Sequence, residues 1–131
     1  MLFIRIVLVP FWQGAPPSEF RNWFEAHSER IRRLMVPLGT AAAATAVSTT
    51  IAEVATGGDA RKSAAVSAVS AVGVGVITQA VNEPANHQFV RPDLPDDDTV
   101  RLLSRWVRWH DVRVVLGLVG AVAAARAASR S

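Results

Sequence analysis

The chain has 131 residues, of which 50% are hydrophobic and only 19% are charged, and its net charge of +3 is carried almost entirely by arginine. It contains no cysteine and no tyrosine, which excludes disulfides, thiolate nucleophiles, cysteine-ligated metals and phenolic acid–base groups. The length suits one domain, residues 1–131, and so small a charged fraction is unusual for a soluble domain of this size.

The charged residues cluster at the ends of apolar runs, as they do in membrane proteins. A nucleic-acid-binding protein would instead spread basic side chains over one polar face. The lipid bilayer is therefore the predicted partner, and nucleic acid is not.

Residues 1–12 are apolar except for Arg5. As a helix they would span only about 18 Å, whereas a bilayer core is about 30 Å thick. The two prolines at 16 and 17 stand where a signal-peptide cleavage site would follow. We interpret this segment as the end of a first membrane helix whose beginning is missing.

Residues 18–33 form the pattern of an amphipathic helix. Its pairs Arg21–Glu25 and Glu29–Arg33 have the spacing of surface ion pairs. Such a helix suits the headgroup boundary of a membrane, or equally the surface of a soluble core. One face carries Phe20, Trp23, Phe24, His27 and Ile31.

Two uncharged runs follow, residues 34–52 and 63–82, and each is long enough to cross a membrane. Pro37 is expected to mark a kink or a boundary near the start of the first run. The polar turn between the runs, residues 57–62, is so short that the two helices must be antiparallel neighbours.

Residues 83–98 are predicted to be a loop, because Pro84, Pro92 and Pro95 interrupt any helix there. Residues 99–128 then form a long helix, whose apolar part, residues 114–125, is expected to cross the membrane. The sequence thus predicts an all-α membrane helical bundle of about four helices, with a truncated first helix and an amphipathic interfacial helix, in a multi-pass protein.

Small residues recur every four positions in the third predicted helix, which indicates close approach of another helix. The row consists of Ser63, Ser67, Ala71 and Gly75. Gln79 continues it, and its amide needs a polar partner if it lies away from water.

Asn82 and Asn86 flank Pro84, where the helix is expected to end. Asparagine side chains suit the unpaired carbonyls of a helix end, and they equally suit a polar pocket at the membrane edge. Both interpretations remain open on the sequence alone.

The last predicted helix places Trp106, His110 and Arg113 on one face. Arginines at 101, 105 and 108 form a separate stripe that is typical of side chains reaching lipid headgroups. Arg113 does not fit that description, because apolar sequence follows it at once. An ionisable residue at the edge of a crossing segment is a functional candidate.

The histidines His27, His87 and His110 have no closely spaced partner, so no metal site is predicted. Gly73 and Gly75 lie inside an apolar run and lack the rest of a dinucleotide fingerprint. No cofactor is predicted.

The motif Asn82-x-Pro84-x-Asn86, followed by Trp106-x-x-Trp109-His110-x-x-Arg113, resembles the anthrone oxygenase-like family of small membrane proteins. The resemblance takes in Phe20 and Trp23 and covers nearly the whole chain. It implies four membrane helices and, in characterised members, oxidation of an anthrone to an anthraquinone by molecular oxygen without an evident cofactor.

The resemblance and the residues together suggest His110 and Arg113 as catalytic, and Gln79, Asn82, Asn86 and Trp106 as binding a hydrophobic polycyclic phenol. A non-catalytic membrane scaffold or accessory protein, in which these residues only order the bundle, is the alternative. A pocket beside His110 would favour the enzyme, and a filled helix interface there would favour the scaffold.

Overall fold

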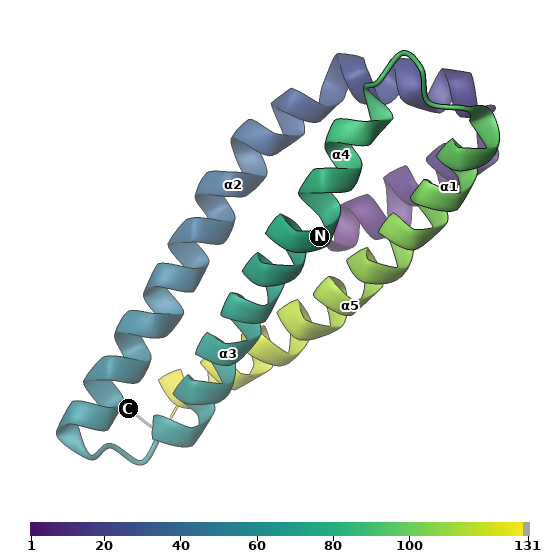
Figure 1. The fold of residues 1–131 in the computed structure, drawn as a ribbon. Helices are drawn as coiled ribbons and strands as arrows, with labels where there is room; N and C mark the ends of the chain where they lie inside the picture. Colours follow the sequence, from purple (N-terminus) through teal and green to yellow (C-terminus); the bar gives the residue numbers. More distant parts are fainter. Residues whose placement is uncertain (130–131) are drawn as a thin grey trace.

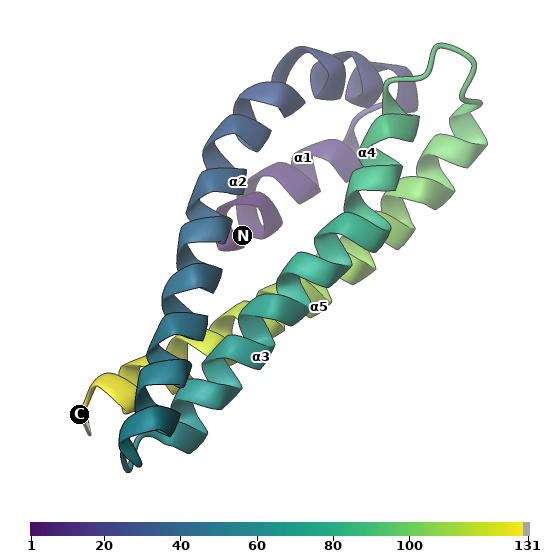
Figure 2. The same ribbon diagram turned by 60° about the vertical axis from the view of Figure 1, so that its left-hand side comes forward.

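The computed structural model describes residues 1–129, and these fold into helices with short connections and no strand. Residues 130–131, the end of the predicted domain, lie outside the described range. In chain order the elements are the π-helical turn η1 (Ile4–Leu8), α1 (Val9–Gly14), α2 (Pro17–Thr56), α3 (Arg61–Ile77), the π-helical turn η2 (Thr78–Asn82), α4 (Glu83–Phe89) and α5 (Asp96–Ala128). Figures 1 and 2 show α3 and α5 running side by side along the molecule, with α2 beside them and the first helix, formed by η1 and α1, between α2 and α5. The predicted all-α bundle is confirmed.

Helix α2 is one continuous helix of 40 residues, although two separate elements were predicted over its length. At 1.5 Å per residue it is about 60 Å long, twice the thickness of a bilayer core. Pro37 lies inside it. A proline removes one backbone hydrogen bond and bends a helix, but the hydrogen-bonded turns on both sides of Pro37 are intact, so α2 continues through it. Figures 1 and 2 show that α2 changes direction along its length.

The predicted loop over residues 83–98 is wrong in its first half, because the third helix continues through η2 into α4. Pro84 lies in the first turn of α4, and the Glu83 N–H bonds to the Thr78 carbonyl, five residues back. This wider π-type turn gives the proline ring room that a regular α-helical turn lacks. The connection to α5 is left to residues 90–95, and three aspartates occupy the first turn of α5, where the helix dipole favours them.

An aromatic core fills the end of the molecule where α1, α4 and the beginnings of α2 and α5 meet. The predicted amphipathic face of residues 18–33 supplies Phe20 and Phe24, both buried, whereas His27 on the same face is exposed. The ring centroids of Phe20 and Phe89 lie 4.9 Å apart, edge to face, which ties α2 to α4. Of the two predicted ion pairs, Glu29–Arg33 forms, but Arg21 pairs with Asp96 instead of Glu25.

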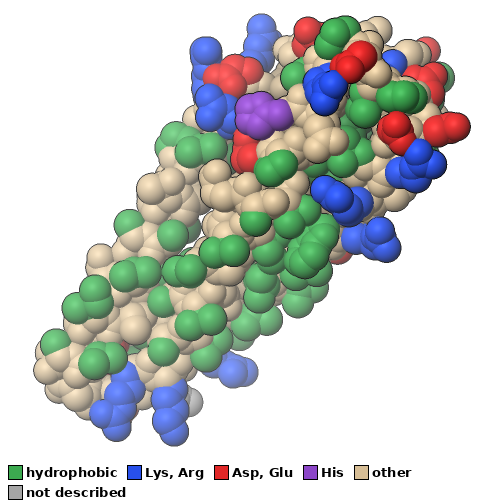
Figure 3. Space-filling model, in the orientation of Figure 1, with side chains coloured by type: hydrophobic (Ala, Val, Ile, Leu, Met, Phe, Trp, Pro, Cys, Tyr) green, Lys and Arg blue, Asp and Glu red, His purple; other side chains and the backbone are tan. Residues whose placement is uncertain are grey.

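In the other half of the bundle, formed by α3 and the ends of α2 and α5, small residues lie inside and large apolar residues lie outside. Ser67 and Ser70 are 7% and 5% exposed, whereas Val69 between them is 73% exposed. Figure 3 shows charged side chains over the two ends of the molecule and mainly apolar and neutral ones between. Two helices, Pro17–Thr56 and Arg61–Phe89, are long and apolar enough to cross a membrane. α5, expected to be a further crossing, is not among them.

Helices α3 and α5 approach each other closely at Gly120. A Cβ atom built there would lie 3.0 Å from Cβ of Ser70 and 3.6 Å from the carbonyl oxygen of Ser67. The predicted small-residue row is correct only in part, since Ser67 lies in this contact but Gly75 is exposed, with no atom within 4 Å of its Cβ position. The row rotates away from α5 along α3, so its last member faces outward.

We therefore predict opposite outcomes for two matched substitutions. Gly120→Leu should force α3 and α5 apart and lower the free energy of unfolding, by about 1–3 kcal/mol as overpacked cores usually do. Gly75→Leu should leave it unchanged or raise it slightly, because leucine has the higher helix propensity. Thermal unfolding of both variants in the same detergent checks this. Equal midpoints would show that the contact at Gly120 is not tight.

Candidate functional site

His110 is the most deeply buried polar side chain of α5, with 0% of its surface exposed. Its Nε2 lies 3.2 Å from the carbonyl oxygen of Met1, and its ring stacks on that of Trp106, with centroids 4.8 Å apart and planes 10° from parallel. A carbonyl oxygen only accepts, so in this hydrogen bond Nε2 carries the proton. Nδ1 is then left with a free lone pair, and within residues 1–129 it has no hydrogen-bond partner.

A chain of hydrogen bonds on the neighbouring helix holds Trp106 in place. Its Nε1 donates to Oδ1 of Asn86 at 2.9 Å, and Nδ2 of Asn86 donates to Oε1 of Glu83 at 3.1 Å. The edge of Trp12 packs against the indole from the other side, at 5.6 Å between centroids. The motifs on α4 and α5 are thus joined directly, and the joint fixes the ring on which His110 stacks.

Asn82 and Arg113 bring further polar atoms into this region that the protein itself does not satisfy. Asn82, in η2, is 1% exposed, yet neither its Nδ2 nor its Oδ1 has a partner in the described part of the chain. The same holds for the buried Nε of Arg113. Within residues 1–129 no hydrogen bond joins Arg113 to Gln79, Asn82 or Asn86. Such atoms cost about 1–3 kcal/mol each when left unpaired, and native proteins contain few of them.

The unpaired atoms of Asn82, His110 and Arg113 lie on adjoining elements, since η2 packs against α5, and Trp12 Nε1 in the aromatic core is a further unpaired atom. They include donors, on Asn82 and Arg113, and a lone pair, on Nδ1 of His110. This arrangement suits a small polar group that both receives and gives hydrogen bonds. Gln79, which was predicted to belong to the site, has an exposed side chain on another face of the helix and lies outside this cluster.

A cavity of about 700 Å³ lies between α2, α3 and α5, directly beyond this cluster. Its volume is within the range of small-molecule sites. Leu116 and Gly117, about one helical turn beyond Arg113, line it, as does Met1, whose carbonyl bonds to His110. Most other lining residues are small, including Gly39, Ala42, Ala46, Ala64, Ser67, Ala71, Gly120, Ala121 and Ala124. His110, Asn82 and Arg113 do not line this cavity themselves, and its wall begins about one helical turn beyond Arg113.

Sequence reasoning missed the contribution of the first helix. Arg5 forms an ion pair with Asp111, the residue after His110, and so fastens η1 to α5 beside the cluster. Both residues are only half-buried. A lone arginine in an apolar segment was the available signal, because such a charge needs a partner. Among residues 1–129 no group of three or more His, Cys, Asp or Glu side chains is placed to hold a metal ion.

The bond between Asn86 and Trp106 yields a prediction about stability. Asn86→Ala should leave the indole N–H buried without an acceptor and lower the free energy of unfolding by about 1–3 kcal/mol. In a Trp106→Phe background the same substitution should lower the free energy of unfolding by clearly less, because the indole N–H donor is absent. His87→Ala, at an exposed neighbour, is the control. Chemical unfolding followed by circular dichroism measures all four; equal costs in both backgrounds would mean that the bond contributes nothing.

One comparison with known protein families covers the motifs on α4 and α5 that the structure brings together. The sequence profile of the anthrone oxygenase family matches residues 20–123, which include Asn82, Asn86, Trp106, His110 and Arg113. No curated protein and no solved structure matches the chain. Because the profile spans most of its length, this chain belongs to the anthrone oxygenase family.

Proposed function

We propose that this protein is a multi-pass membrane enzyme that oxidises a hydrophobic polycyclic phenol with molecular oxygen. The observation that carries the proposal is the buried His110, whose Nε2 is engaged by the Met1 carbonyl while its Nδ1 keeps a free lone pair, about two helical turns from Leu116 and Gly117 in the wall of a cavity of about 700 Å³. Family membership supplies the reaction class.

The distribution of apolar surface supports the membrane placement. In the apolar window of α2 no residue is buried within the bundle, and in that of α3 only 17% are. A core helix of a soluble protein would show the reverse. Side chains such as Ile51, Val69 and Val76 are more than half exposed, and so large an apolar surface needs a lipid or protein partner.

Membrane integration is tested by extraction. Membranes that contain the protein are washed with alkaline carbonate, and the pellet and supernatant are assayed for it. The protein should stay in the pellet, because α2 and α3 would expose their apolar faces to water if released. Recovery of the whole protein in the supernatant would refute an integral membrane protein.

In the proposed reaction the substrate lies in the cavity, with its polar edge toward α5. Nδ1 of His110 removes a proton from the methylene carbon, and the resulting electron-rich anion carries its charge on the ring oxygen. The N–H groups of Asn82 and Arg113 stabilise that oxyanion, and in doing so gain the partners they lack in the free protein.

The overall change is balanced with oxygen as the only oxidant. The methylene carbon loses two hydrogens and gains a carbonyl oxygen from O₂. The second oxygen atom leaves as water with those two hydrogens. Dioxygen thus accepts four electrons, two from each C–H bond broken, and the substrate becomes a quinone.

The roles of the remaining site residues follow from their contacts. Asn86 and Trp106 have their polar groups bonded to one another, so we assign them to positioning the His110 ring and not to contact with the substrate. Gln79 takes no part in this proposal because its side chain is exposed.

Activity is tested with anthrone as the probe, in membranes from expressing cells, by oxygen uptake and quinone absorbance against membranes without the protein. His110→Phe keeps an aromatic ring on Trp106 but removes the base, and the rate should fall about 10²–10⁴-fold. Arg113→Leu should also lower it strongly. His87→Phe and Arg105→Leu, at exposed positions, should retain the rate. Small and equal effects in all four would leave the scaffold role as the better explanation.

A further inference from the structure

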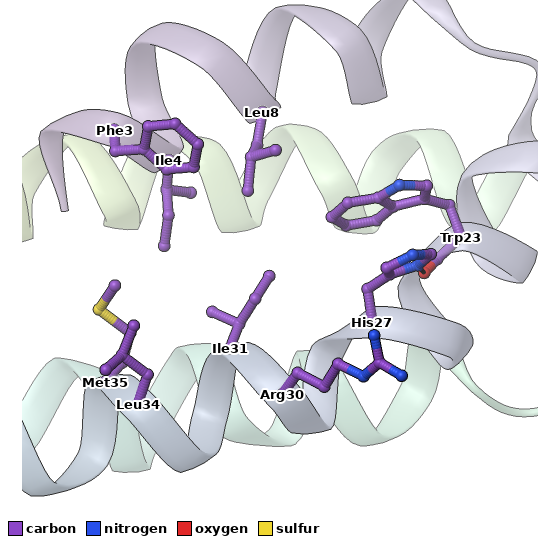
Figure 4. Close-up of a pocket in the computed structure, with 9 residues that line it drawn as sticks. All are labelled: Phe3, Ile4, Leu8, Trp23, His27, Arg30, Ile31, Leu34 and Met35. Carbon is purple, nitrogen blue, oxygen red and sulfur yellow. Dashed lines mark hydrogen bonds between the residues drawn. The ribbon is translucent and has the colours of Figure 1, made fainter.

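A second cavity, of about 300 Å³, lies between the first helix and α2, away from the cluster around His110. Figure 4 shows Ile4 and Leu8 on one wall, facing Ile31 and Met35 on the other. Nothing in the proposed reaction uses this space. It is smaller than the cavity between α2, α3 and α5, and its walls are formed mainly by apolar side chains, which suit a hydrocarbon chain.

The two ends of this cavity differ in character. At one end Phe3 and Leu34 are 61% and 57% exposed, so the apolar wall continues onto the outer surface. At the other end the stacked rings of Trp23 and His27 close the space, with centroids 4.7 Å apart, and Arg30 lies at the edge. The space is therefore apolar inside and cationic at one side of its rim.

The charge at the rim is not neutralised by the protein. Glu29 pairs with both Arg32 and Arg33 on the neighbouring face of α2. Arg30 forms no ion pair within residues 1–129. Its guanidinium group is available to an anion, and a phosphate diester is a group that arginine binds well.

We propose that this cavity binds one acyl chain of an anionic phospholipid, with the lipid phosphate held by Arg30. The inference rests on the membrane placement proposed above and not on the oxidation reaction. A bilayer presents such lipids at high local concentration, and Arg30 lies four residues before the apolar run that begins at Leu34, where a headgroup would be.

The test is native mass spectrometry of the full chain in mixed micelles with equal amounts of phosphatidylglycerol and phosphatidylcholine. The wild-type protein should retain phosphatidylglycerol in preference. Arg30→Gln should lower that retention about fivefold. Arg33→Gln removes the same charge from the same helix outside the cavity, and it should retain the lipid as the wild type does.

A second variant tests the acyl chain independently of charge. Ile31→Trp fills the cavity and should abolish retention, whereas Val69→Trp adds the same bulk to an exposed position of α3 and should not. Equal retention by the Arg30 and Arg33 variants, or equal retention of both lipids by the wild type, would overturn the proposal. So would retention of added oleate in place of phosphatidylglycerol, which would assign the cavity to free fatty acids. If the protein does not oxidise anthrone, the lipid-binding proposal still stands. If carbonate releases the protein from membranes, the membrane placement on which this proposal rests is refuted.

Discussion

The close approach of α3 and α5 at Gly120 sets the geometry of the rest of the molecule. A Cβ atom there would lie 3.0 Å from Cβ of Ser70, so the two helices approach this closely only because residue 120 is a glycine. The continuation of α3 through η2 and α4 therefore runs beside the first half of α5. This alignment brings Asn86 within hydrogen-bonding distance of Trp106, and places Asn82 against α5.

The two halves of the bundle follow different packing rules, and the candidate site lies where they meet. One half is an aromatic core of the kind found in soluble proteins, centred on Phe20 and Phe89. In the other half small residues face inward and leave a cavity of about 700 Å³. His110 and Arg113 stand at the junction, with polar atoms that no protein group satisfies. Native proteins contain few such atoms, which makes this junction the candidate site.

The π-helical turn η2 explains why the site lies inside a helix and not in a loop. A regular α-helical turn would clash with the ring of Pro84 and would kink there. The wider turn, in which the Glu83 N–H reaches the Thr78 carbonyl, lets the helix continue with Asn82 turned into the bundle. π-Turns of this kind are frequent at functional sites, because they redirect side chains without breaking the helix.

The sequence by itself determined the helical class, the antiparallel pair joined at Gly57, the long last helix and the residues that carry polar chemistry. These depend on local signals: hydrophobic periodicity, uncharged runs of sufficient length, a short polar turn with two glycines, and polar side chains in apolar surroundings.

Only the tertiary structure decided which of those polar residues meet. Gln79 and Asn82 are three residues apart on the same helix, yet one is exposed and the other is buried. The π-turn changes the angular position of every residue after it, and sequence periodicity assumes a regular helix. The carbonyl partner of His110 was equally hidden, because Met1 is 109 residues away along the chain and a backbone oxygen has no signature in a sequence. The chemical type of each side chain can be read directly from the sequence, whereas the groups that it contacts depend on how distant helices pack.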